Sequence, residues 1–207
     1  MFYGLPLMNN LLAEIDNMLQ TLIEADRYLF LLINKAHDPI VDFVMFWATD
    51  KWIWIPFYIW LLYILIKNFG KKIFVLLIII SVMITLSDQA SVMVKEAVHR
   101  LRPCRDPYFA GIIHLVKQGC GGQFGFISSH ASNTMSLAVL IAGIIPAPNK
   151  WLRVELFSYV LLVGYSRIYL AAHFPGDILG GWLLGILLGF LGILVFNKFV
   201  LKEHNPL

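Results

Sequence analysis

The residues of this chain whose types could do chemistry fall into three polar clusters within a largely apolar sequence. The first is "KEAVHRLRP", in which Lys95 and Arg102 are two helical turns apart and share a face if a helix persists. The second is "FISSHASN", which contains His130. The third is "SRIYLAAHFPGD", in which His173 and Asp177 flank a Pro-Gly pair. Cations, imidazoles and a carboxylate are therefore confined to three short segments.

These residue types suit the transfer of a phosphoryl group. Lysine and arginine neutralise phosphate oxygens, and arginine makes bidentate contacts with them. Backbone N–H groups at a helix start near Ser128 and Ser129 would add an anion-binding end. One imidazole can act as nucleophile when a carboxylate orients it, and the other can protonate a leaving oxygen. Because the cations neutralise the charge, we expect neither a metal ion nor another cofactor.

The composition predicts that these clusters are carried by a membrane protein. Of the 207 residues, 59% are hydrophobic and 14% are charged, which is too little charge for the surface of a soluble domain. Residues 178–197 hold no charge at all, and about 20 apolar residues span a hydrocarbon core of about 30 Å. We therefore expect an integral membrane protein.

Four further apolar segments predict an all-α, polytopic membrane helical bundle with about five transmembrane helices. They are residues 52–66, 73–87, 131–149 and 151–172. A sixth span would form if residues 20–36 also insert. In residues 9–35, however, apolar and acidic positions alternate with helical spacing, which is typical of a helix lying in the membrane interface.

These patterns divide the chain into three parts. We expect an amphipathic, interfacial helical segment at residues 1–50, a transmembrane domain at 51–200 with a long loop at about 99–127, and a short tail at 201–207. Basic residues cluster on one side of a five-span topology, which should be the cytoplasmic side. They are Lys67, Lys71, Lys72, Lys150, Arg153, Lys198 and Lys202. The long loop and the three polar clusters then face the opposite side.

Together, the three clusters resemble the three-part signature of the type 2 phosphatidic acid phosphatase family, integral membrane lipid phosphatases that share a site with vanadium haloperoxidases. The matching positions are Lys95, Arg102, Ser128, Ser129, His130, Ser166, Arg167, His173 and Asp177. The sequence departs from the family where Ile127 replaces Pro and Ser129 replaces Gly. Ser129 keeps its backbone N–H, but its Cβ would crowd the anion site.

The resemblance implies a role for each position. His173 would attack phosphorus and form a phosphohistidine, Asp177 would orient it, and His130 would protonate the leaving group. The phosphate oxygens would be held by Lys95, Arg102, Ser128, Ser129 and Arg167. Taken singly, each residue also fits a structural role, and Asp177 could cap the last helix as well as serve in catalysis. The conjunction of three motifs favours the catalytic interpretation.

The implied function is that of a metal-independent hydrolase of a lipid phosphate or pyrophosphate. Candidate substrates are undecaprenyl diphosphate, phosphatidylglycerol phosphate, phosphatidic acid and lipid A phosphate. The layout is similar to short bacterial members, which implies the bacterial inner membrane with the site facing the periplasm or exterior. A lipid phosphotransferase using the same intermediate is one alternative, and a non-enzymatic anion-binding membrane protein is a weaker one. We expect no nucleic-acid partner, and the oligomeric state is left open.

Four residues near the motifs carry further expectations. Asp88 lies on the same helical face as Lys95, and as an intramembrane acid it would either support the basic cluster or form a plain helix–helix hydrogen bond. Ser166 would be a supporting partner of the site. Cys104 and Cys120 lie in the loop on the side where disulfides persist, and a bridge would be worth about 3 kcal/mol. Two unpaired thiols are the alternative.

Overall fold

The computed structural model describes residues 5–116, 120–146 and 150–201, and these residues form helices and turns with one isolated β-bridge between Leu101 and Phe124. The helices are α1 (Leu5–Lys35), α2 (Pro39–Thr49), α3 (Ile55–Phe69), α4 (Ile73–Val98), α5 (Ser129–Ile144), α6 (Lys150–Tyr169) and α7 (Pro175–Phe196). Short 3-10 turns lie at Gly70–Lys72, Pro103–Arg105 and Pro107–Phe109, and a π-helical end lies at Asn197–Leu201. The predicted all-α class is confirmed.

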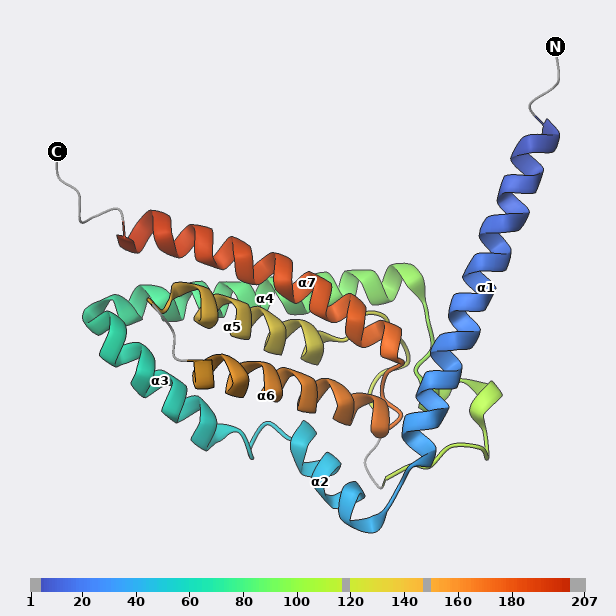
Figure 1. Ribbon diagram of the computed structural model, residues 1–207, viewed down its shortest axis with the longest axis horizontal. Coiled ribbons are helices and arrows are strands. Elements are labelled where there is room, and N and C mark those ends of the chain that lie inside the picture. The colour runs from blue at the N-terminus through green and yellow to red at the C-terminus, as the bar shows by residue number, and fades with distance from the viewer. Residues whose placement is uncertain (1–4, 117–119, 147–149, 202–207) are drawn as a thin grey trace.

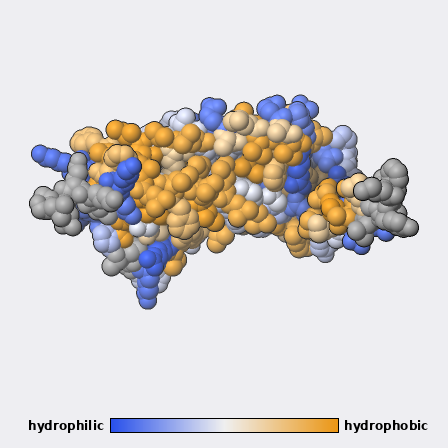
Figure 2. Space-filling view, turned by 90° about the horizontal axis from the view of Figure 1, so that it is seen from above, coloured by the Kyte–Doolittle hydropathy of each residue, from blue (hydrophilic) through white to orange (hydrophobic). Residues whose placement is uncertain are grey.

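Helix α5 is the centre of the bundle, and it contacts α4, α6 and α7 (Figure 1). It is largely buried, whereas α7 carries large exposed apolar side chains such as Leu183, Leu187 and Leu194 on its outer face. Figure 2 shows apolar side chains over much of the visible surface, with hydrophilic ones gathered towards the two ends. An apolar outer surface suits helices that face lipid rather than water.

Among the described residues, two stretches are long and apolar enough to cross a bilayer, Ile55–Val98 and Pro175–Val200, and the first of these combines α3 and α4. The number of spans therefore stays a prediction. Several predicted segment boundaries differ from the helix ends by a few residues. Residues 51–54 form turns before α3 begins at Ile55, and α5 ends at Ile144 rather than at residue 149.

A row of glycines in α7 sets how closely it approaches α5. A Cβ at Gly181 would lie 2.5 Å from the carbonyl oxygen of Ser128, and one at Gly185 would lie 2.5 Å from that of Ser132. Only a residue without a side chain allows backbones to approach this closely. The glycines therefore bring the start of α5 against the start of α7, where two of the polar clusters lie.

The N-terminal helix has two different halves. The first half projects from the bundle (Figure 1) and exposes apolar side chains such as Leu11, Leu12 and Met18. The second half packs against the bundle, where Phe30 is fully buried against Phe109 and Phe174. An interfacial location for the first half stays a prediction, as does the division into three parts. Lys202 and most of the tail lie outside the described residues.

Candidate active site

The three polar clusters meet at one end of the bundle. The C-terminal ends of α4 and α6 lie there beside the N-terminal ends of α5 and α7 (Figure 1). Lys95 near the end of α4 donates to Oγ of Ser129 at 2.8 Å, and Nη1 of Arg102 lies 3.3 Å from Nε2 of His173. Segments separated by about 30 to 80 residues therefore form one site.

His173 lies in the turn between α6 and α7, and it is buried together with Asp177. Nδ1 of His173 faces Oδ2 of Asp177 at 3.4 Å, and the same oxygen accepts the backbone N–H of Phe174 at 2.9 Å. Asp177 is thus the N3 residue of α7 and also caps that helix. Both roles expected for Asp177 are compatible in this geometry.

Burial and neighbouring cations lower the pKa of His173 well below its ordinary value. Burial is the larger cause, and the positive charges of Arg167, Arg102 and Lys95 act in the same direction. The imidazole is therefore neutral near pH 7. In the tautomer whose Nδ1–H donates to Asp177, Nε2 carries the lone pair, which is the form needed for nucleophilic attack.

Arg102 reaches the site from a loop and not from a helix, so the condition for a helical face shared with Lys95, that the helix persists to Arg102, is not met. Helix α4 ends at Val98, and His99 takes a left-handed conformation with φ of 53° that turns the chain away. The guanidinium of Arg102 donates from Nε to Phe124 O at 3.1 Å and from Nη1 to Ala172 O at 3.2 Å. These bonds fix Arg102 in place. Burial, the largest cause, lowers its pKa, and Arg105 adds to this.

The guanidinium of Arg167 has one N–H group without a hydrogen-bond partner among the described residues. Its Nη1 donates to Oγ1 of Thr49 at 2.8 Å, and its Nε is buried without a hydrogen-bond partner among the described residues. A buried donor left unpaired is costly, and an anion bound at the site would satisfy it. This orphaned N–H is consistent with the expected phosphate contact.

Ser128 and Ser129 differ in whether their backbone N–H groups are available to an anion. The N–H of Ser128 donates to the carbonyl oxygen of Asp177 at 3.0 Å, and its Oγ accepts from Ala131 N–H as the N-cap of α5. The N–H of Ser128 is therefore not free for an anion. Ser129 begins α5, where N–H groups have no intrahelical partner, and its Oγ accepts from Lys95.

His130 has exposed surface at the start of α5. Partial burial of its ring, and then the nearby positive charges of Arg167, Arg102 and Lys95, lower its pKa to about 3. An exposed imidazole in this place can exchange protons with solvent or with a leaving group.

The structure also shows the contacts of the residues that were expected near the motifs. Asp88 accepts from Nδ2 of Asn133 at 2.9 Å, which is the helix–helix hydrogen bond among its two expected roles. Ser166 is buried and donates to Val163 O within its own helix. Cys104 and Cys120 form a disulfide, with their Cα atoms 6.0 Å apart.

Sequence reasoning missed Arg100, Asp26 and Thr49. Arg100 pairs with Asp177, Asp26 pairs with Arg100, and Thr49 orients Arg167. No periodicity or motif connects these partners, which are 74 to 118 residues apart. The only signal was the position of Arg100 between Lys95 and Arg102 in the first cluster.

Comparison with known proteins agrees with this geometry. The model of the PAP2 superfamily matches residues 72–201. Lipid A 4'-phosphatase of Bacteroides thetaiotaomicron is 33% identical over 91% of this chain and 84% of its own length. Lipid A 4'-phosphatase of Porphyromonas gingivalis is 32% identical over 83% of this chain and 72% of its own length.

A solved structure shares the fold. The transmembrane PAP2 type phosphatidylglycerolphosphate phosphatase of Bacillus subtilis superposes with a TM-score of 0.66 at 23% identity, over 86% of this chain and 88% of that one. The expectation of a membrane lipid phosphatase is confirmed by these relatives. The family model covers more than half of the chain and the first two relatives cover most of it, so this protein belongs to the PAP2 superfamily.

Proposed function

We propose that this protein removes the 4'-phosphate of lipid A through a phosphohistidine at His173. The observation that carries the chemistry is the buried His173 held between Asp177 and Arg102. The substrate is supported by the two lipid A 4'-phosphatases that match most of the chain. Among the expected lipid phosphates, lipid A is thus the one favoured by relatives at more than 30% identity.

In the first step, Nε2 of His173 attacks phosphorus and a P–N bond forms as the P–O bond to the sugar breaks. Asp177 accepts the Nδ1–H and stabilises the positive charge that develops on the ring. His130, whose protonated form is favoured once the negative phosphate is bound beside it, gives a proton to the departing sugar oxygen. The dephosphorylated lipid leaves, and the phosphoryl group stays on His173.

In the second step, the now neutral His130 takes a proton from water, and the oxygen of that water attacks phosphorus. The P–N bond breaks, its electrons return to Nε2 of His173, and inorganic phosphate is released. His130 ends protonated and His173 neutral, which is the state in which both began. His130 therefore acts as the acid in the first step and as the base in the second, so one imidazole serves both steps.

Three cations stabilise the charge on the transferring group. Arg102 is held rigidly beside Nε2 of His173, Arg167 offers its unpartnered Nε, and Lys95 lies beside the start of α5. Donors that are already in place before the reaction cost no reorganisation and strengthen as charge develops. This set suits a phosphate monoester, whose oxygens carry two negative charges.

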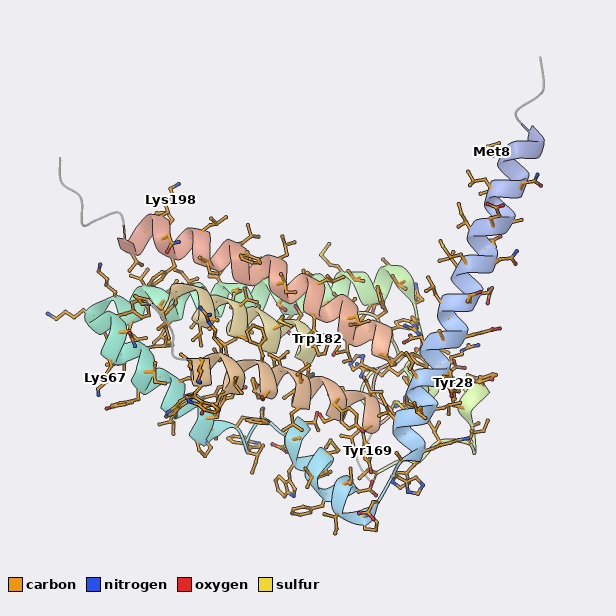
Figure 3. All side chains as sticks on the ribbon, viewed as in Figure 1. Met8, Tyr28, Lys67, Tyr169, Trp182 and Lys198 are labelled. Carbon is orange, nitrogen blue, oxygen red and sulfur yellow. A yellow bond between two sulfur atoms is a disulfide. The ribbon has the colours of Figure 1, made fainter. Side chains whose placement is uncertain are left out.

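We also propose that the site faces the periplasm across a bacterial inner membrane. Lys67 and Lys198 lie at the end of the bundle opposite Tyr169 and Tyr28, and the catalytic turn follows Tyr169 directly (Figure 3). Basic residues favour the cytoplasmic side, which leaves the site on the other side. The Cys104–Cys120 disulfide in the loop beside the site supports an oxidising compartment.

The test is phosphate release from lipid A bisphosphate, phosphatidylglycerol phosphate, undecaprenyl diphosphate and phosphatidic acid in detergent micelles with EDTA. Wild type should release phosphate from lipid A fastest, from the 4' position, and His173→Ala should release none. Activity that survives in His173→Ala would contradict the assigned nucleophile. Release that requires an added lipid acceptor would instead identify a phosphotransferase.

A further inference from the structure

The carboxylate of Asp177 has a cationic partner besides the imidazole. Nη1 of Arg100 donates to Oδ1 of Asp177 at 2.9 Å, while Oδ2 accepts from Phe174 N–H and faces Nδ1 of His173. Asp177 has no exposed surface. A buried carboxylate stays ionised only when charges and hydrogen bonds replace its hydration. Arg100 supplies that charge on the side of the carboxylate that faces away from His173.

Arg100 is itself held by the N-terminal helix. Its Nη2 is ion-paired with Oδ2 of Asp26 in α1, and Oδ1 of Asp26 accepts the N–H of Gly176 at 2.7 Å. The guanidinium also lies over the ring of Phe174, 4.2 Å from its centroid. Two carboxylates and one aromatic face thus restrain a single guanidinium directly behind the catalytic turn.

The packing around these charges is close. A Cβ at Gly176 would lie 2.9 Å from Oδ2 of Asp26, and a Cβ at Gly125 would lie 2.8 Å from Oδ2 of Asp177. Glycine at both positions lets the charged groups approach the backbone. The side chains of Asp26 and Arg100 are only 14% and 24% exposed, so this is a confined pair and not a solvated surface one.

We propose that Asp26 and Arg100 are positioning residues of this active site. They hold Asp177, and through it the ring of His173, in the orientation needed for attack on phosphorus. Both act through Asp177 and not on the phosphate. The inference rests on the proposed function, and it makes α1 part of the catalytic framework as well as a helix with an exposed apolar half.

The first experiment compares Arg100→Gln, Arg100→Lys and Asp26→Asn in the full-length protein in detergent, with lipid A bisphosphate as substrate. We expect Arg100→Gln to lower kcat by about tenfold or more with KM nearly unchanged, because binding of the phosphate is not touched. Asp26→Asn should lower kcat by less, and Arg100→Lys should recover part of the loss since it keeps a cation beside Asp177.

Arg27→Gln is the matched control. Arg27 lies next to Asp26 on α1, pairs with Asp106 at 3.5 Å and is 35% exposed, but it makes no contact with Asp177. Its loss removes an ion pair between α1 and the bundle without changing the catalytic turn, so kcat should stay near the wild-type value. A fall in kcat as large as that of Asp26→Asn would show that general docking of α1 is what matters, and would overturn the inference.

The decisive measurement is a double-mutant cycle. If Arg100 acts through Asp177, adding Arg100→Gln to Asp177→Asn should cost no further kcat. The same factor lost in both backgrounds would contradict the inference. Should Arg100→Gln fail to fold by size exclusion, Arg100→Lys and Asp26→Asn carry the same cycle. A wild type inactive on the whole lipid panel contradicts the proposed function, and the inference with it. An active wild type with undiminished variants contradicts the inference alone.

Discussion

Nη1 of Arg102 lies 3.3 Å from Nε2 of His173, so a rigid cation and the proposed attacking atom face the same space. Two backbone carbonyls, those of Phe124 and Ala172, hold this guanidinium in place. A phosphate oxygen bound by Arg102 would bring phosphorus next to the lone pair of His173. Orientation of this kind supplies much of the rate enhancement in phosphoryl transfer.

Replacing Arg102 should therefore weaken catalysis more than folding. We expect Arg102→Gln to lower kcat by about 10²- to 10³-fold, because one preorganised donor to the transition state is lost. Steady-state phosphate release measures this. Arg105→Gln is the control, since Arg105 is exposed and donates to Gly121 O in the same loop. Equal losses in the two variants would argue against a specific role for Arg102.

Replacing His130 should make the rate depend on the leaving group. For the lipid substrate, whose leaving alkoxide needs a proton, His130→Gln should lower kcat by about 10²- to 10⁴-fold. For p-nitrophenyl phosphate, whose leaving group is stable without a proton, the first step should be much less affected. Single-turnover formation of the phosphoenzyme separates the two cases. A similar loss with both substrates would mean that His130 is not the acid.

The lowered pKa of His173 predicts a loss of stability in acid. The unfolded chain binds a proton at this residue below about pH 6.5, whereas the folded chain does not until the pH is well below that. Stability from this group is therefore complete above about pH 6.5 and falls below it, by up to about 1.4 kcal/mol per pH unit. The melting temperature of His173→Gln in detergent should fall less over the same range. Parallel curves for the two proteins would contradict the prediction.

Adding a methyl group between α5 and α7 should loosen the whole bundle. A Cβ at Gly185 would lie 2.5 Å from Ser132 O, so Gly185→Ala forces the helices apart. We expect a cost of about 1–3 kcal/mol, read as a lower melting temperature. Gly122→Ala is the matched control, because a Cβ there meets nothing within 4 Å. No difference between the two variants would show that the helices accommodate the contact.

Removing the disulfide should destabilise the loop beside the site. Cys104→Ser should lower stability by about 3 kcal/mol, since the bridge closes a loop with a sequence separation of 16. Reductant should lower the melting temperature of wild type and leave Cys104→Ser unchanged. A melting temperature of wild type that does not respond to reductant, with both thiols free by titration, would contradict this prediction.

Sequence alone was enough to predict most of the helices and the three motifs. Each depends on local information: apolar runs of about the length of a membrane span, and side-chain chemistry at fixed spacing. These patterns repeat along the chain, so they can be read without knowing the fold. The pairing of Cys104 with Cys120 was also predicted, because both lie in the loop expected on the side where disulfides persist.

Only the tertiary structure decided which groups support the catalytic ones. Arg102 comes from a loop after α4 ends at Val98, and the N–H of Ser128 is used by Asp177 O. Asp26 reaches Arg100 across 74 residues. Such contacts leave no periodic trace in a sequence, because each depends on how separate helices dock. The reacting residues of this protein can therefore be identified from its motifs. The orientation of His173, in contrast, depends on residues that are distant in sequence and meet only in the folded chain.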